Sequence, residues 1–307
     1  MKIQSRSELT AILAASLGNV FWGFSFLLIR IAYRVSDPSH LLSIRFVFAF
    51  ILLNIILLVR KEKLHFRGRR YLPLLCGLMT LELTGYYFES YGIVFTNSTF
   101  AGISLSVVPV IALLFGVIFL REFPTRRQIL FSFLPIAGVI LITISGHEIG
   151  IVRAVGVLCL LGAILSYAGY RTINRIISQE FSSMERTYAV LGCCAVVCTL
   201  AALVQDGWNL KLYFAPLAEP EFLYPMLILS VFCSIGSNLL VNFAATQLSV
   251  LKLSIIGTIC SLCSMFAGVV FLHEPMTGMM GFGAIITLIG IWQVTAPQKT
   301  AAKEPEG

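Results

Sequence analysis

The sequence has little charge and few of the acidic and imidazole side chains on which soluble proteins and metalloenzymes depend. Asp, Glu, Lys and Arg make up 12% of the 307 residues and hydrophobic residues 58%, whereas soluble domains carry about 25% charged residues. The only aspartates are Asp37 and Asp206, and there are four histidines. A soluble globule of this length could not coat its surface with so few charges. The composition also excludes a disordered chain and a disulfide-rich secreted scaffold.

Several catalytic motifs are also missing. The dipeptide Gly-Lys does not occur, so there is no phosphate-binding loop for direct ATP-driven transport. The absence of His-Glu-x-x-His excludes an intramembrane zinc protease, and the absence of Asp-Asp-x-x-Asp argues against a metal-using prenyl transferase. Cys260 and Cys263 form a Cys-x-x-Cys pair without a second pair or a nearby histidine. We therefore expect no metal and no cofactor, and the eight cysteines should pack as small apolar residues.

The sequence is rich in long apolar runs. A membrane-spanning helix needs about 20 mostly apolar residues, and runs this long without strict alternation favour helices over barrel strands. We find ten such runs, which predicts an all-α, polytopic membrane protein embedded in a lipid bilayer. They lie near Thr10–Tyr33, Pro38–Val59, Tyr71–Val94, Thr99–Leu120, Gln128–Ser145, Ile151–Tyr170, Thr187–Val204, Phe222–Thr246, Val250–Leu272 and Gly278–Thr295.

Basic residues indicate the orientation of such a protein, because they concentrate in cytoplasmic loops. With ten spans and both ends cytoplasmic, 17 of the 22 Lys and Arg residues lie in inside segments. Arg30, Arg34, Arg153 and Lys211 lie outside, and Arg45 lies within a span. This asymmetry predicts both termini on the cytoplasmic side of the cell membrane. Because the net charge of +7 resides mostly in these short loops, it does not indicate a nucleic-acid partner.

The chain contains an internal repeat. Gly116–Thr125 aligns with Gly268–Thr277 at a shift of 152, with six of ten positions identical, and a related shift of 145 places Arg30 on Arg175. We therefore expect a first five-helix repeat at 1–146, a second at 147–297 and a flexible cytoplasmic tail at 298–307. Because five is odd, the second repeat enters the membrane from the opposite side. Inverted repeats of this kind are typical of transporters, whose substrate site lies near the midplane between the copies.

Two short motifs carry a family resemblance. The first span contains Asn-x-x-Trp-Gly (Asn19, Trp22, Gly23), and the fourth and ninth spans end in Leu-x-Glu at Glu122 and Glu274. With ten spans in two repeats, the chain resembles the EamA-type transporters of the drug/metabolite transporter superfamily from about residue 10 to 295. The resemblance implies small organic solutes, usually exported, and in some members aromatic or other amino acids. The second half departs from the first where Tyr167 stands at the Trp22 position.

Ionisable residues inside a span are costly and are functional candidates by default. Glu82, Tyr86 and Glu89 fall at i, i+4 and i+7 of the third span, so they share one face that should look inward. Arg45 and Glu89 lie at similar depths, and we expect them to form an ion pair that is structural or gates the cavity. Glu82 then has no cationic partner in the sequence. It could bind a substrate ammonium group, carry a coupling proton, or bond a neighbouring helix as a protonated acid.

Other polar and aromatic side chains lie within the spans. Trp22 is close to midspan, which favours a wall of the substrate cavity over an interface anchor, with packing as the alternative; Tyr167 is its repeat mate. Asn19 lies about one turn before Trp22. Asn238 and Asn242 are one turn apart in the eighth span, where they could line the cavity or hydrogen-bond between helices.

Two features concern helix ends and bends. Glu122 and Glu274 lie near headgroup level, where we interpret them as gating or loop-locking residues rather than substrate ligands. Pro109, midway along the fourth span, should bend its helix. Its repeat mate is Ser261, so we expect this bend only in the first half.

The leading hypothesis is a secondary transporter that moves a small organic metabolite by alternating access and is not an enzyme. A membrane-embedded enzyme acting on a lipid-like substrate would need clustered catalytic groups near a membrane surface, and Glu82 with Glu89 is the only candidate pair. A passive channel would lack two closed states. The sequence contains no feature that defines the substrate, the transport direction or the oligomeric state.

Overall fold

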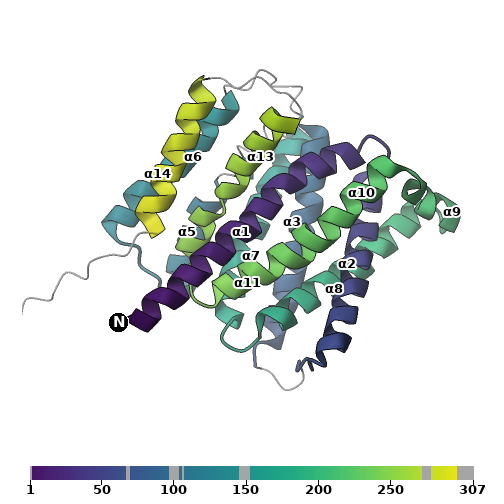
Figure 1. Ribbon diagram of the computed structural model, residues 1–307, viewed down its shortest axis with the longest axis horizontal. Helices are drawn as coiled ribbons and strands as arrows, with labels where there is room; N and C mark the ends of the chain where they lie inside the picture. The colour runs from purple at the N-terminus through teal and green to yellow at the C-terminus, as the bar shows by residue number, and fades with distance from the viewer. Residues whose placement is uncertain are drawn as a thin grey trace, which may run out of the picture.

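The computed structural model describes residues 2–66, 70–96, 104–105, 107–144, 153–271 and 278–295. Within these ranges the secondary structure is helical, without strands (Figure 1). The helices of the first half are α1 (Lys2–Ala32), α2 (Pro38–Arg60), α3 (Leu72–Phe95), α5 (Val108–Leu120) and α6 (Arg126–Ile144). Those of the second half are α7 (Ala154–Ile177), α8 (Ser183–Gln205), α9 (Leu210–Phe214), η1 (Ala215–Ala218), α10 (Pro220–Ile228), η2 (Leu229–Gly236), α11 (Ser237–Ala245), α12 (Val250–Ile256), α13 (Ile259–Phe271) and α14 (Gly278–Thr295).

The apolar runs of the sequence are helices in the structure. Each of the ten expected ranges overlaps a helix, with α10, η2 and α11 forming one continuous segment and α12 and α13 a pair. Among the described residues, six helical segments are long and apolar enough to cross a membrane. They are Arg6–Ala32, Pro38–Arg60, Ala154–Ile177, Ser183–Gln205, Pro220–Ala245 and Val250–Phe271. Val108–Leu120 and Gly281–Val294 are shorter apolar helices, and α3 is 24 residues long but carries two glutamates.

Local sequence signals set several helix ends. The side chain of Asp37 accepts hydrogen bonds from the amides of Ser39 and His40 and so caps α2. Ser182 and Glu185 form a capping box at the start of α8. These caps mark opposite ends of the bundle. We call them the Asp37 end, where α1 ends and α2 begins, and the Ser182 end, where α7 ends and α8 begins.

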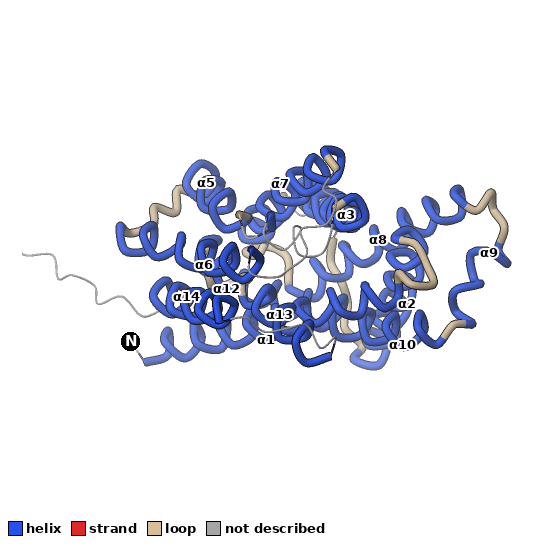
Figure 2. The backbone as a smooth tube through the Cα atoms, turned by 90° about the horizontal axis from the view of Figure 1, so that it is seen from above, coloured by secondary structure: helices blue, strands red, loops and turns tan. Residues whose placement is uncertain are grey.

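The helices pack in a few extensive pairs. α3 runs along α7, α2 along α8, and α6 along α14, while α1 lies between α11 and α13. Figure 2 shows the same bundle from above, with α6 and α14 at one side and α2, α8 and α10 at the other. Large apolar side chains such as Leu58, Ile118 and Trp292 remain exposed on the outside. An exterior of this kind suits contact with lipid.

Three helical segments are irregular near their middle. Val107 is a turn residue whose N–H bonds to Ser104 O before α5 begins, and Pro109 lies in the first turn of α5. Gly257 and Thr258 separate α12 from α13 in the corresponding segment of the second half, again with an i to i+3 hydrogen bond. The expectation of an interruption in the first half alone is therefore wrong. Glycine and local 3₁₀-type bonding interrupt the second helix without a proline. The third irregularity is the π-helical turn η2.

Candidate functional site

The polar face of α3 packs against α7. The hydroxyl of Tyr167 on α7 donates a hydrogen bond to a carboxylate oxygen of Glu89. The Tyr167 ring also meets the Tyr86 ring edge to face, with 6.4 Å between centroids. Gly85 permits this contact, because a Cβ at that position would lie 2.7 Å from the Tyr167 ring. The structure thus brings together three of the residues that the sequence singled out: Tyr86, Glu89 and Tyr167.

Glu82, one turn further along the same face, is buried with an unpartnered oxygen. Its side chain is 2% exposed, and neither its Oε2 nor the hydroxyl of Tyr86 has a hydrogen-bond partner. Three charged groups act on it electrostatically, Arg171 from α7, Glu89 from its own helix and Arg45 from α2. Buried polar atoms are normally paired, so these two oxygens mark a place where a ligand, a water or a proton can bind.

The expected Arg45–Glu89 ion pair is not formed. Arg45 Nε donates instead to Ser234 Oγ on η2 at 2.7 Å, and its guanidinium lies over the Phe46 and Tyr86 rings at 5.2 and 5.7 Å from their centroids. The reason is the helix packing, because α2 runs along α8 and η2 while α3 runs along α7. Similar depth in neighbouring spans therefore did not make the two side chains meet.

The two asparagines of the eighth span have different surroundings. Asn242 accepts hydrogen bonds from Asn174 Nδ2 at 2.8 Å and from the Tyr170 hydroxyl at 3.1 Å, so it bonds between helices. Asn238 donates to its own helix at Ser234 O and lies 3.5 Å from the Tyr170 hydroxyl. Tyr170 thus links both asparagines of α11 to α7.

Asn19 and Trp22 lie in the interface of α1 with the second half of the chain. Trp22 Nε1 donates to Cys233 O at 3.0 Å, and the side chain packs against two apolar clusters, one with Ala32 and one with Ala11 and Ala15 of α1. Asn19 donates to Ala15 O at 2.7 Å while its Oδ1 has no partner. These contacts of Trp22 are those of a packing residue and do not join it to the α3 face.

Glu122 joins three segments at the Ser182 end. Its Oε2 accepts from Val250 N, the first residue of α12, at 3.0 Å, and its Oε1 lies 3.5 Å from Arg175 Nε on α7. Arg175 Nη1 donates to Ala245 O and Thr246 O at the end of α11. We call these contacts the Glu122–Arg175 clamp. Glu274, the repeat mate of Glu122, lies outside the described residues.

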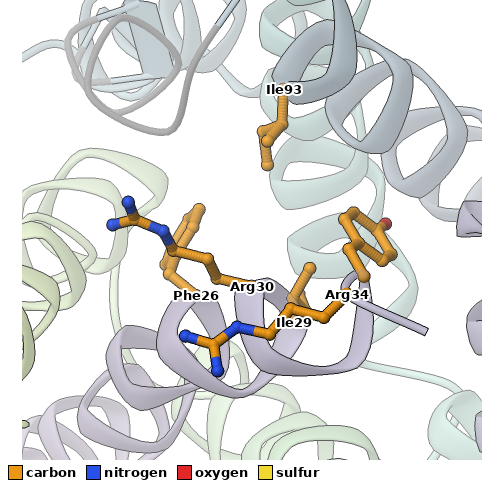
Figure 3. Close-up of a pocket in the computed structure, with 6 residues that line it drawn as sticks. Phe26, Ile29, Arg30, Arg34 and Ile93 are labelled. Carbon is orange, nitrogen blue, oxygen red and sulfur yellow. The ribbon is translucent and has the colours of Figure 1, made fainter. Parts of the chain in front are cut away.

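A cavity of about 120 Å³ opens at the Asp37 end (Figure 3). It is lined by Phe26, Ile29, Arg30, Tyr33, Arg34 and Ile93. Figure 3 shows Ile93 of α3 across the cavity from the residues of α1 and the turn after it. Tyr33 follows the last residue of α1, and burial raises its pKa to about 12. Its hydroxyl is therefore neutral, so the charges at this cavity are the two arginines.

Sequence reasoning misses one arginine of the site, Arg171, and one structural arginine, Arg186. The expected spans leave both in the loop between Tyr170 and Thr187, but α7 continues to Ile177. Arg186 belongs to α8 and is fully buried. The signal for Arg171 was its spacing, since it lies four residues after Tyr167 and so shares its face. Among the described residues, there is no group of three or more His, Cys, Asp or Glu side chains that could hold a metal ion.

Comparisons with known proteins agree with this architecture. A family model described as the EamA-like transporter family matches residues 9–144 and again 154–296. The chain is 30% identical to "Uncharacterized transporter YcxC" of Bacillus subtilis (strain 168) over 92% of this chain and 91% of that protein. It is 26% identical to "Uncharacterized transporter YvbV" of the same organism, over 94% and 92%. One solved crystal structure superposes with a TM-score of 0.75 at 16% identity, over 93% of this chain and 96% of that one, which shows a shared fold.

Proposed function

Because this chain belongs to the EamA-like transporter family, we propose that it is a secondary transporter that moves a small organic metabolite by alternating access. Membership makes it an integral membrane protein of the transporter class rather than an enzyme. Export is the direction that the family resemblance favours. The proposal extends to ten membrane spans in two inverted repeats, at 1–146 and 147–297, followed by a cytoplasmic tail at 298–307.

The helix packing supports the repeat. Each helix of one half has a repeat mate in the other half. The contact of α3 with α7 therefore corresponds to that of the α10–α11 segment with α1, and the contact of α5 with α7 corresponds to that of α12–α13 with α1. All four of these contacts are present, and the pairs α2 with α8 and α6 with α14 each join a helix to its own repeat mate. The family model also matches each half separately. Two such halves in opposite orientations can exchange conformations, which is the physical basis of alternating access.

The proposed orientation has the Ser182 end in the cytoplasm of the cell. The basic loop that starts at Arg60, together with the Lys and Arg residues near both termini, supports this arrangement. Three of the 17 basic residues that the expected spans assign to inside segments, Arg171, Arg175 and Arg186, lie in helices rather than loops. They therefore carry less weight as orientation signals than the exposed residues do.

The unpartnered carboxylate oxygen of Glu82 is the observation that carries the proposed site. It lies on an inward face of α3 beside Tyr86, with Arg171 and Arg45 as neighbouring charges. In this proposal Glu82, Tyr86, Tyr167 and Asn238 line the substrate path, with Asn19 at the α1 side. Glu82 carries a coupling proton or bonds a donor group of the substrate. Interruptions at Gly257 and near Val107 support a midplane site, because broken helices line transport cavities.

The test is counterflow in liposomes. Purified protein should take up one labelled metabolite from a panel saturably, and faster when the unlabelled compound is inside, at an acidic and an alkaline pH. Glu82→Gln should abolish uptake or its pH dependence while the melting temperature stays near that of the wild type. Glu219→Gln, at an exposed position, is the matched control and should transport normally. Unsaturable flux indicates a channel, and full activity of Glu82→Gln removes Glu82 from the mechanism.

A further inference from the structure

Among the described residues, the guanidinium groups of Arg45 and Arg186 are almost completely buried, but their hydrogen bonding differs. The Arg186 side chain is fully buried, and all three of its nitrogens donate to protein oxygens. Nε donates to Ser182 O, Nη1 to the backbone and side-chain oxygens of Asn174, and Nη2 to Asn242 O at 2.6 Å. Arg186 is therefore a structural cation whose three nitrogens all have protein partners, and it ties α7, α8 and α11 together.

Arg45 is 2% exposed but is not saturated. Its Nε donates to Ser234 Oγ, while its two terminal nitrogens have no hydrogen-bond partner in the part of the chain that the structure describes. Its other neighbours are the Phe46 and Tyr86 rings. A guanidinium stays charged at any physiological pH, and burying a charge without an anion is costly. The terminal nitrogens of Arg45 thus have no hydrogen-bonded anion, although the side chain is buried.

The nearby carboxylates act on Arg45 electrostatically, but neither forms an ion pair or a hydrogen bond with it. Glu89 bonds the Tyr167 hydroxyl, and the first cation acting on Glu82 is Arg171. The Tyr86 hydroxyl, on the ring over which Arg45 lies, is also buried and unpartnered. A fork of two N–H donors beside one hydroxyl donor matches a carboxylate, which accepts bidentate bonds from arginine.

Arg45 lies in the half of α2 that is nearer the cavity at the Asp37 end. Arg30 and Arg34 line it, and Tyr33 at its wall interacts electrostatically with Arg45. An entrance lined by two cations raises the local concentration of anions. Arg30 and Arg34 therefore carry charge of the same sign as the buried guanidinium of Arg45.

We propose that the terminal nitrogens of Arg45, with the Tyr86 hydroxyl, bind a carboxylate of the transported molecule, so that this chain selects small carboxylate-bearing metabolites. The proposal rests on the transporter function but is tested by binding alone. Arg45 lies seven residues after the start of α2, roughly 10 Å along the helix at 1.5 Å per residue. At that depth a substrate that enters from water fits better than a lipid headgroup.

The experiment measures the thermal shift of the purified protein with small carboxylates and their neutral amide isosteres. The probes are acetate, propionate, benzoate and phenylacetate, each beside its amide, with chloride and phosphate as inorganic anions. At least one carboxylate should raise the melting temperature while its amide does not. Arg45→Gln should remove this difference, and Arg45→Lys should weaken binding by about tenfold or more, because a point charge replaces a bidentate fork.

Tyr86→Phe keeps the proposal testable if the Arg45 variants fail to fold. The Tyr86 hydroxyl has no partner, so its removal should not lower stability, but carboxylate binding should weaken by about tenfold. Tyr87→Phe removes the adjacent unpartnered hydroxyl and should leave binding unchanged. Three outcomes would overturn the proposal: carboxylates and amides bind equally, chloride raises the melting temperature as much as a carboxylate does, or Tyr86→Phe binds carboxylates as the wild type does. Counterflow without carboxylate binding would contradict this inference but not the transport function. Carboxylate binding without counterflow would contradict the transport function but not this inference.

Discussion

Arg175 Nε lies 3.5 Å from Glu122 Oε1, and the same two side chains hold the end of α11 and the start of α12 at the Ser182 end. The opposite end of the bundle has the cavity between α1 and α3. By the repeat, Arg30 of that cavity corresponds to Arg175 of the clamp. In the alternating-access cycle that we propose, the clamp opens when the substrate path opens toward the Ser182 end.

Substitutions at Glu122 should separate the two functions of the clamp. Glu122→Gln removes the ion pair but keeps an oxygen for the Val250 amide, whereas Glu122→Ala removes both. The N-cap of α12 is Ser249, so Glu122 adds a second hydrogen bond at the same helix end. We expect loss of this bond to cost about 1 kcal/mol, and hence to speed amide exchange at the start of α12 roughly fivefold, in Glu122→Ala alone. Hydrogen exchange with mass spectrometry measures this effect. Equal exchange in both variants would show that Glu122 does not hold the start of α12.

The sequence predicted how deep the polar residues lie but not which of them meet. Depth and spacing along one helix follow from the 3.6-residue period, so the shared face of Glu82, Tyr86 and Glu89 could be predicted. The contact of Glu89 with Tyr167 rather than Arg45 depends on how α3 is rotated and which helix it packs against. The rotation of α3 and its packing partner depend on close contacts between helices, such as that of Gly85 with the Tyr167 ring. Such contacts cannot be predicted from the pattern of residues along one helix.

The same limit applies to helix ends. The EamA resemblance, the all-helical class and the approximate ends of the helices could be predicted, because long apolar runs are a strong signal. A span that ends at its first charged residue leaves Arg171 and Arg186 in the loop between the sixth and seventh expected spans. Both continue helices instead, and Arg186 lies among backbone carbonyls that satisfy its donors. A helix can include a charged residue beyond its apolar run when oxygen atoms of neighbouring helices replace water as hydrogen-bond partners of that side chain.

Arg186→Met should be among the most destabilising single substitutions in this chain. It leaves the oxygens of Asn174 and Asn242 buried beside an apolar side chain, at about 1–3 kcal/mol for each unsatisfied group. Arg186→Lys should also lower the melting temperature, because one ammonium cannot replace three separate nitrogens. Arg60→Met, at an exposed side chain, is the control and should melt like the wild type. A wild-type melting temperature for Arg186→Met would contradict the structural role given to Arg186.

His40 should make the stability of the Asp37 end depend on pH. Its Nδ1 lies 2.6 Å from Asp37 Oδ2 and its Nε2 2.8 Å from Asp206 Oδ2. Carboxylates only accept, so the ring satisfies both only as the doubly protonated imidazolium. The stabilisation is present when the ring is protonated and is lost as the pH rises and the imidazolium gives up a proton. The melting temperature should therefore fall from mildly acidic to mildly alkaline pH in the wild type and stay level in His40→Gln. Parallel pH profiles for the two proteins would rule out this role.

Gly138 should be essential for the contact between α6 and α14. A Cβ at Gly138 would lie 2.2 Å from Thr287 Oγ1 and 2.4 Å from Gly283 O, so alanine would force the two helices apart. Gly278, at the start of α14, has open space around its Cβ position. Overpacking typically costs about 1–3 kcal/mol, and here one contact is backbone that cannot rotate away. Gly138→Ala should therefore lower the melting temperature clearly, while Gly278→Ala should match the wild type because a methyl group there meets nothing. If both variants melt like the wild type, α6 and α14 do not pack at this distance.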